Sequence, residues 1–200
     1  MNALKEKRMK SAIKYTWPFY IVAVLIVYIV MSILFNIAHP IPAYKSLTLF
    51  VTGEVQERDK LSKDIFERFE DNKIRNFSCI ASLRTDSDYA TKLKVAGYNS
   101  ADVLILPNSV IENVSDPASF ALNINNELIN SFYQGYSFYQ RNENNYGIKI
   151  DKSKVAQYMA LPEEDCYMFL NGASKNLGDY GLNPVTEHDM ALQIVKDWGM

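Results

Sequence analysis

The sequence has few of the residues on which catalytic and metal sites usually depend. Its 200 residues include two histidines, His39 and His188, and two cysteines, Cys79 and Cys166, so no pair stands at metal-ligand spacing. The patterns HExxH, GxSxG and CxxC and the phosphate-binding P-loop are all absent from it. We therefore predict no catalytic residue, no metal site and no cofactor, and expect that the protein is not an enzyme.

Two acidic groups still have the residue type that acid–base catalysis uses. Asp86 and Asp88 fit helix capping better, and the run Glu163-Glu164-Asp165 fits a solvated loop better. A hydrolase whose site these patterns do not reveal stays open as an alternative function.

The chain also lacks an excess of basic residues. It has 21 basic and 23 acidic residues, and its first sixteen residues hold five of the basic ones and one acidic one. The remaining 184 residues therefore carry 16 basic and 22 acidic side chains, a net charge of −6. Nucleic-acid binding calls for a basic face, so we exclude nucleic acid as a partner.

One long apolar run is present, from Trp17 to Phe35, and its nineteen residues carry no charge. A helix of about 20 apolar residues spans the roughly 30 Å hydrocarbon core of a bilayer. Basic residues gather before the run, whereas Lys45 is the only one in the twenty or so residues after it, which predicts a cytoplasmic N-terminus. The preceding basic residues are Lys5, Lys7, Arg8, Lys10 and Lys14.

These features predict a single-pass protein of the cell membrane in four parts. Residues 1–16 form a basic cytoplasmic tail and residues 17–38 a transmembrane helix in the lipid bilayer. Residues 39–45 form a linker, and residues 46–200 form an extracytoplasmic domain.

A cleaved signal peptide is the competing interpretation of the N-terminus. Its apolar core is usually about 7 to 15 residues long and ends at a small-residue cleavage site. The run here is longer, and Asn36 stands where a small residue is wanted, with Pro40 shortly beyond. We therefore favour an uncleaved anchor.

The two cysteines leave the redox state open. A disulfide between Cys79 and Cys166 would close a long loop and stabilise the domain, in the chain-entropy model, by about 4 to 5 kcal/mol. Both residues lie inside apolar runs that predict buried strands, where a free thiol behaves as a small hydrophobic group.

The order of predicted elements indicates an α/β fold. Apolar runs rich in β-branched residues predict strands at 46–52, 77–83 and 101–106. Helical spacing and capping residues predict helices at 56–70, from an N-cap at Asp86 to Gly97, and from Asp116 toward Ile129. This β-α-β-α-β-α order is typical of a parallel sheet with helices on both faces.

The last third of the chain has a different pattern. Residues 131–140 and 146–150 flank a polar turn and predict an antiparallel hairpin, and residues 166–170 predict one more strand. Thr186 with Asp189 forms a capping-box pattern for a final helix. We therefore predict one three-layer lobe with a mostly parallel sheet plus an antiparallel hairpin, preceded by the transmembrane helix.

Candidate binding residues follow the predicted parallel strands. In open α/β sheets, ligands bind in the crevice beyond the carboxyl ends of the strands. Those ends carry Glu54 after the first strand, Asp86 after the second and Asn108 after the third, with Tyr89 in the helix that follows Asp86. Such a polar rim can hydrogen-bond hydroxyl groups, although turn and capping residues have the same composition.

Four segments resemble the N-terminal lobe of the extracellular solute-binding proteins of bacterial ABC importers, especially the sugar-binding branch. They are LTLFVTG at 47–53, DYATKL at 88–93, ADVLIL at 101–106 and YGIKI at 146–150. The resemblance implies that Glu54, Asp86, Tyr89 and Asn108 contribute to a ligand cleft. Family members are about twice as long and hold the ligand between two lobes, whereas this chain has room for one.

The strand at 166–170 and the helix after it can therefore be interpreted in two ways. They either begin a second lobe or return to complete the first, and we favour the return. A single lobe cannot close around a solute, so we expect a non-enzymatic accessory or docking subunit of a membrane complex, with an ABC permease as the partner that the resemblance implies. A weak binder or sensor of a small sugar-like solute is the alternative.

Overall fold

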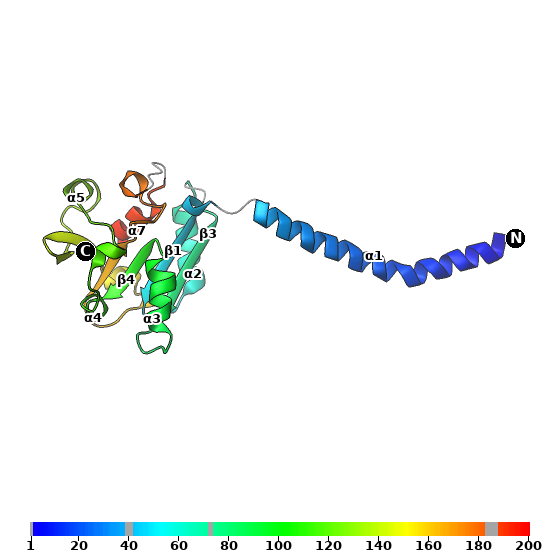
Figure 1. The fold of residues 1–200 in the computed structure, drawn as a ribbon, viewed down its shortest axis with the longest axis horizontal. Helices are drawn as coiled ribbons and strands as arrows, with labels where there is room; N and C mark the ends of the chain where they lie inside the picture. Colours follow the sequence, from blue (N-terminus) through cyan, green and yellow to red (C-terminus); the bar gives the residue numbers. More distant parts are fainter. Residues whose placement is uncertain (1, 39–41, 72–73, 183–187) are drawn as a thin grey trace. The chain divides into compact units, whose positions relative to one another are not determined.

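The computed structural model describes residues 2–38, 42–71, 74–182 and 188–200, which belong to two units. Unit 1, Met1–Pro40, contains one long helix, α1 (Asn2–Ala38), and unit 2, Ile41–Met200, contains the other described elements (Figure 1). Two predictions touch residues outside these ranges: part of the 39–45 linker, and Thr186 of the capping box.

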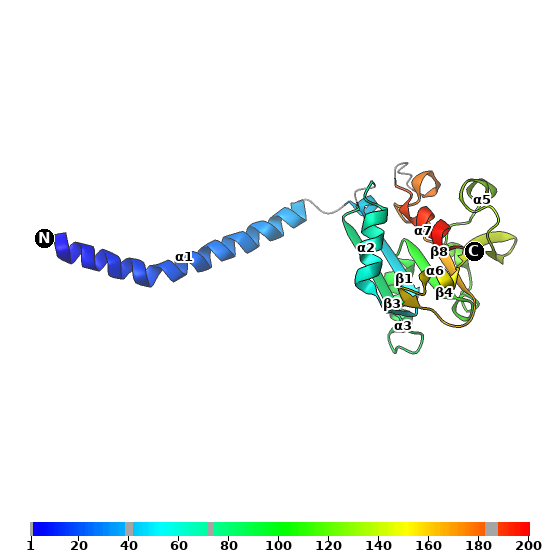
Figure 2. The ribbon, with the colours of Figure 1, turned by 180° about the vertical axis from the view of Figure 1, so that it is seen from behind.

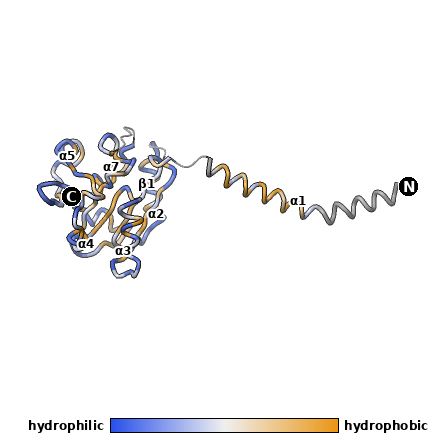
Figure 3. The backbone as a smooth tube through the Cα atoms, in the orientation of Figure 1, coloured by the Kyte–Doolittle hydropathy of each residue, from blue (hydrophilic) through white to orange (hydrophobic). Residues whose placement is uncertain are grey.

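Helix α1 contains the predicted apolar run. Its segment Trp17–Phe35 has a mean hydropathy of 2.6, and none of its residues is buried. Figure 3 shows this segment as a continuous hydrophobic stretch of the helix. The chain therefore has an N-terminal helix that is long and apolar enough to span a membrane.

Unit 2 is an α/β domain built on a mixed six-stranded sheet with the order β3-β1-β4-β8-β6-β5. A separate two-stranded sheet pairs β2 (Glu54–Val55) with β7 (Met159–Ala160). The strands of the large sheet are β1 (Ser46–Thr52), β3 (Asn76–Ser82), β4 (Val103–Pro107), β5 (Phe138–Arg141), β6 (Asn144–Lys149) and β8 (Cys166–Leu170).

The parallel part of the sheet is smaller than predicted. Strand β1 pairs in parallel with β3 on one side and β4 on the other. Strand β8 lies between β4 and β6 and is antiparallel to both, and β5 and β6 form the predicted antiparallel hairpin. Because β8 completes the same sheet, the last strand and helix return to the first lobe, as we favoured.

Hydrophobic cores lie on both faces of the sheet. Successive residues of a strand point to opposite faces, so Leu49 and Val51 enter one core while Phe50 enters the other. Helices α2 and α3 lie on opposite faces, as Figures 1 and 2 show from the two sides. The first core includes residues of α2 (Arg58–Arg68), α5 (Asn126–Phe132), α6 (Lys152–Val155) and α7 (Met190–Trp198), and the second includes residues of α3 (Tyr89–Lys92), the π-helical turn η2 (Leu93–Tyr98) and α4 (Asn108–Ile111).

The prediction of one helix from Asp116 toward Ile129 is wrong. Asp116 caps only the short 3-10 turn η3 (Pro117–Ser119), where its carboxylate accepts a hydrogen bond from the Ala118 amide. The chain then extends beside the end of β8, with the Leu122 amide donating to the Leu170 carbonyl at 2.7 Å. A new cap at Asn125 begins the separate helix α5.

The helix predicted to begin after Asp86 starts later. The Asp86 carboxylate accepts hydrogen bonds from Ser82 and from the Leu83 amide, so it closes the turn after β3 and leaves the helix uncapped by its side chain. Helix α3 begins at Tyr89 and passes into the wider turn of η2.

The charged face of α2 binds other parts of the domain. Within α2 itself, Lys63 and Glu67 form an ion pair at 3.7 Å. Asp64 instead accepts a short hydrogen bond from the Tyr158 hydroxyl, and Arg68 pairs with Asp197 of α7. These contacts join α2 to two segments that follow it by about 90 and 130 residues in the chain.

A buried carboxylate joins the opening of β1 to the loop after β8. Asp102 accepts hydrogen bonds from the Thr48 amide at 2.7 Å, from the Ser174 hydroxyl and from the Asn176 side chain at 3.1 Å. Burial raises the pKa of Asp102, and the hydrogen bonds from Ser174, Thr48 and Asn176 oppose that rise. The loop is thereby fixed against two strands at once.

Both cysteines are free and buried, Cys79 in β3 and Cys166 in β8. Two strands lie between β3 and β8, which at about 4.8 Å per strand separates them by roughly 14 Å, and Cys79 lies level with Leu170, four residues along β8 from Cys166, so the two cysteines are farther apart still. A disulfide needs Cα atoms within about 7 Å, which this arrangement excludes.

We predict that neither thiol reacts readily with a thiol reagent in the folded protein. Burial raises the pKa of each thiol to about 11, so the reactive thiolate is scarce at pH 8. Titration with Ellman's reagent at pH 8 should detect almost no thiol in the native protein. It should detect two after unfolding without a reductant. Finding none in the unfolded protein would show a disulfide.

Candidate functional site

The carboxyl ends of β1, β3 and β4 meet at one edge of the sheet, where a ligand crevice is expected. The chain leaves β1 through α2 on one face and reaches β4 through α3 on the other. Connections that diverge to opposite faces create a topological switch point, the usual place for a ligand in an open α/β sheet.

A segment of the chain itself crosses this edge. Residues 158–165, which we call the closing segment, run from β7 to the start of β8. The Tyr158 carbonyl accepts hydrogen bonds from the amides of Gln56 and Glu57, at 2.9 and 3.1 Å. At the other end, the Asn108 amide donates to the Asp165 carbonyl at 2.8 Å. The closing segment thus joins the loop after β1 to the end of β4.

Gly53 permits this close approach. A Cβ atom at Gly53 would lie 2.5 Å from the carbonyl oxygen of Ala160, closer than real Cβ atoms come to backbone. The closing segment therefore packs directly on the backbone that follows β1.

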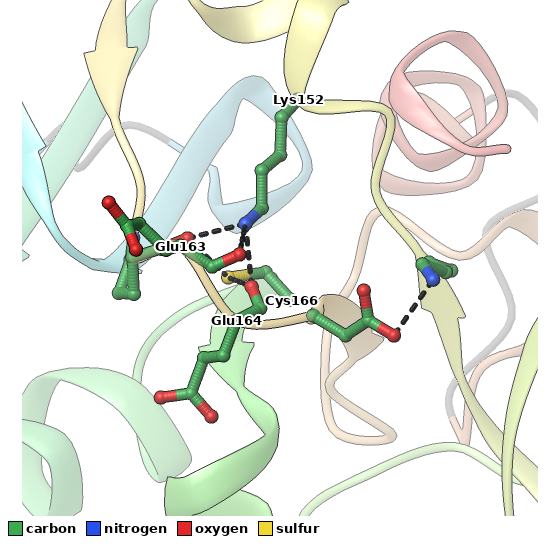
Figure 4. Close-up of polar contacts among 7 residues, drawn as sticks. Lys152, Glu163, Glu164 and Cys166 are labelled. Atoms are coloured by element: carbon green, nitrogen blue, oxygen red, sulfur yellow. Dashed lines mark hydrogen bonds and ion pairs between the residues drawn. The ribbon is translucent and has the colours of Figure 1, made fainter.

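Lys152, the first residue of α6, holds the closing segment through its side chain. Its ammonium donates to three successive backbone carbonyls, those of Pro162 (2.5 Å), Glu163 (2.7 Å) and Glu164 (2.6 Å) (Figure 4). The Cys166 sulfur lies 3.5 Å from the Glu164 carbonyl in the same cluster. An ammonium group has three donors, so this geometry uses its full capacity.

Glu164 attaches the closing segment to the end of β4 through its side chain. The Ser109 amide and hydroxyl both donate to its carboxylate, at 2.7 and 2.5 Å. Arg84, which follows β3, donates to the same hydroxyl at 2.7 Å. The hydrogen bond from Ser109 lowers the pKa of Glu164, and the charges of Arg84 and Lys152 add to that effect.

Two predicted site residues, Glu54 and Asp86, take separate places on this edge. Glu54 lies in β2, and its exposed carboxylate has no hydrogen bond or ion pair within the described part of the chain. The Asp86 carboxylate is held by Ser82 at 2.8 Å and by the Leu83 amide at 2.9 Å.

The other two predicted site residues, Asn108 and Tyr89, also have separate partners. The Asn108 side chain donates to Glu112 at 2.6 Å, one turn along α4. The Tyr89 hydroxyl lies 2.8 Å from the Thr52 hydroxyl at the end of β1, and the pair is buried. The structure therefore does not gather the four predicted residues around one cavity.

Tyr89 does line a pocket of about 380 Å³, between the α3 region and the chain that follows β4. Arg84 and Tyr98 line it as well, with aliphatic side chains between them. Burial raises the pKa of Tyr89 and, to about 12, that of Tyr98.

A second pocket, of about 600 Å³, shares Tyr98 with the first. Phe120 and Tyr146 supply aromatic surface there, Asn99 and Asn123 supply amides, and none of the described residues that line it is charged.

Sequence reasoning missed Arg84, Ser109, Lys152 and Glu164. Ser109 follows Asn108 directly at the predicted strand end, and it is Ser109 whose side chain contacts the closing segment. Glu164 belongs to an acidic run that composition assigns to a solvated loop. Nothing local identifies Lys152, because its partners are backbone carbonyls that any sequence supplies.

Comparisons with known proteins add no relatives. No family model, no curated protein and no solved structure matches the chain. Among the described residues, no group of three or more histidines, cysteines and carboxylates is placed to hold a metal ion.

We predict that Lys152→Met loosens the closing segment. Three carbonyls lose a charged donor, which should lower the free energy of unfolding by about 1 to 2 kcal/mol. Amide exchange at residues 158–165, measured by mass spectrometry, should become faster. The matched control is Lys94→Met, because Lys94 is exposed and makes no contact in the described ranges. Unchanged exchange in Lys152→Met would contradict this account.

We also predict that Ser109→Ala raises the pKa of Glu164 toward its ordinary value, because it removes the hydroxyl donor. The Ser109–Glu164 contact stabilises the domain above the ordinary carboxyl pKa and is lost as the pH falls through the lowered pKa. Carboxyl carbon NMR during an acid titration measures the change. Ser115→Ala, at an exposed serine after α4, serves as the control, and an equal shift in both variants would disprove the assignment.

Proposed function

We propose that the chain is a membrane-anchored, non-enzymatic extracytoplasmic domain that acts as an accessory or docking subunit of a membrane complex. The closing segment carries the proposal. It covers the strand-end edge where a solute would bind, and Lys152 and Glu164 hold it there with charged hydrogen bonds. A domain whose expected crevice is occupied by its own chain is better suited to binding through its surface.

The chemistry of Ser109 supports a non-enzymatic role. A serine nucleophile needs a neighbouring base that can accept its proton. The carboxylate next to Ser109 is Glu164, whose pKa is lowered by that very contact, so it is a weak base. The pair is suited to fixing the closing segment.

The connection between β6 and β8 supports a single lobe of the solute-binding type. Only sixteen residues, 150–165, join these strands, and they form α6, β7 and the rest of the closing segment. A second lobe inserted at this point would need many more. The proposal is therefore one lobe with an anchor, with no second lobe inserted between β6 and β8.

The N-terminal charges give the orientation within this proposal. Five basic residues precede Trp17–Phe35, which supports a cytoplasmic N-terminus with unit 2 outside. A domain tethered in this way meets partners in the same membrane, and an ABC-type permease is the partner that the resemblance favours.

A weak solute binder or sensor is the second candidate, and the pocket beside Tyr89 favours it. Calorimetry of the folded chain with a panel of sugars and peptides tests this candidate. Heat signals that Tyr89→Ala removes would support it, and silence across the panel would reject it.

We predict that charge reversal on the closed edge abolishes docking. Glu54 and Glu163 are exposed, and neither carboxylate has a described partner, so Glu54→Lys with Glu163→Lys should leave the fold intact. Crosslinking of the anchored protein in its own cells, followed by mass spectrometry, should identify a permease subunit for the wild type. The double variant should lose most of this crosslinking.

Glu127→Lys is the matched control, because it reverses an exposed acid on α5, at the other end of the sheet in both Figures 1 and 2. Loss of the crosslink in the control, or its survival in the double variant, would exclude this edge as the docking surface. Absence of any enriched membrane protein would reject the docking function itself.

A further inference from the structure

The 380 Å³ pocket beside Tyr89 combines an apolar wall with one cation. Leu93, Val110 and Val114 supply aliphatic surface, and Arg84 is the one charged side chain among the described residues that line it. Small-molecule sites are typically of about 300 to 1,000 Å³, mostly apolar, with a few polar groups that orient the ligand. The pocket has this composition, at the small end of the range.

Arg84 is available to an anion. One of its guanidinium nitrogens donates to the Ser109 hydroxyl, which leaves its remaining donors unused by the residues that the structure describes. Glu164 lies beyond Ser109 in this chain of hydrogen bonds and forms no ion pair with Arg84. The pocket therefore carries a positive charge on a domain whose net charge is −6.

Two tyrosines, Tyr89 and Tyr98, also line the pocket and differ in their hydrogen bonding. The Tyr89 hydroxyl is already paired with Thr52, whereas the Tyr98 hydroxyl has no hydrogen bond to any described residue. Burial and the neighbouring Tyr89 keep Tyr98 protonated at neutral pH, since they raise its pKa to about 12. Tyr98 thus offers a neutral O–H donor inside the same pocket as Arg84.

We infer that this pocket binds a small aliphatic carboxylate. The aliphatic body lies against Leu93, Val110 and Val114, and the carboxylate accepts hydrogen bonds from Arg84 and from the Tyr98 hydroxyl. A guanidinium and a neutral hydroxyl together match a carboxylate, while an ammonium ligand would be repelled. The larger pocket has no charged residue among its described lining and should not share this preference. The inference does not depend on docking, which the closed edge would perform.

Three probes with one hydrocarbon body test the inference: 4-methylpentanoate, 4-methylpentanol and 4-methylpentylamine. Binding to the full chain in phosphatidylcholine nanodiscs is measured by ligand-observed NMR, with empty nanodiscs subtracted. We expect the acid to bind about ten-fold or more tightly than the alcohol, because a charged hydrogen bond contributes at least that factor, and the amine to bind least.

Variants assign the binding to this pocket. Arg84→Gln should weaken the acid about ten-fold or more and leave the alcohol almost unchanged, whereas Arg84→Lys should keep most of the affinity. Ser109→Ala removes the partner of Arg84 but keeps the cation, so it should still bind the acid. Ala90→Trp fills this pocket and should abolish binding, while Ala118→Trp fills the larger pocket and should have no effect.

Two results would overturn the inference. It fails if the folded wild type binds the acid no better than the alcohol, or if Arg84→Gln binds the acid as well as the wild type does. Thermal unfolding of each variant checks that it is folded. If Ala90→Trp does not fold, Arg84→Gln decides the question, because Arg84 is exposed.

Discussion

Strand β8 is the element on which the rest of the domain depends. Its five residues pair with β4 on one side and with β6 on the other, so it connects the parallel strands to the hairpin. Its start is held by Lys152 through the preceding carbonyls, and its end continues into the loop that Asp102 fixes. Removing this strand would separate β5 and β6 from the sheet and open both cores.

The chain between β6 and β8 closes the edge of the sheet. These strands are antiparallel neighbours, yet the chain that joins them does not turn directly from one to the other but passes through α6 and β7 and crosses the carboxyl ends of β1 and β4. The closing segment is this crossing, and its contacts with Gln56, Asn108 and Ser109 follow from the route. The fold therefore covers the strand-end crevice with its own chain, and the two pockets described above lie over the second core.

Local sequence patterns were sufficient to predict a strand or helix where the apolar residues follow the spacing of that element. The runs at 46–52 and 101–106 become β1 and β4. They failed where two local signals compete: Asp116-Pro117 opens only a turn, because pairing with β8 interrupts the helix before Asn125 caps it again.

The site was harder to predict because it depends on partners that are distant in the chain. Glu164 accepts a hydrogen bond from Ser109, which lies 55 residues away in the chain, and no local sequence pattern at either residue predicts this contact. Tyr89 was found because it follows a strand end, yet its neighbour in the pocket, Arg84, looks like any exposed turn residue. Residue type and spacing locate the edge of a sheet, whereas the direction of the returning chain decides what covers it.

The entry of the chain into unit 2 has a mechanical consequence. The linker leads through η1 (Ala43–Lys45) into Ser46, the first residue of β1, which is an interior strand of the sheet. Tension carried along the chain from α1 therefore reaches two parallel ladders together, those to β3 and β4, before it reaches any loop. Hydrogen bonds loaded side by side share a force and resist it far better than bonds that open one after another. The domain is thus attached by one of its strongest elements, as a part that must stay folded under load would be.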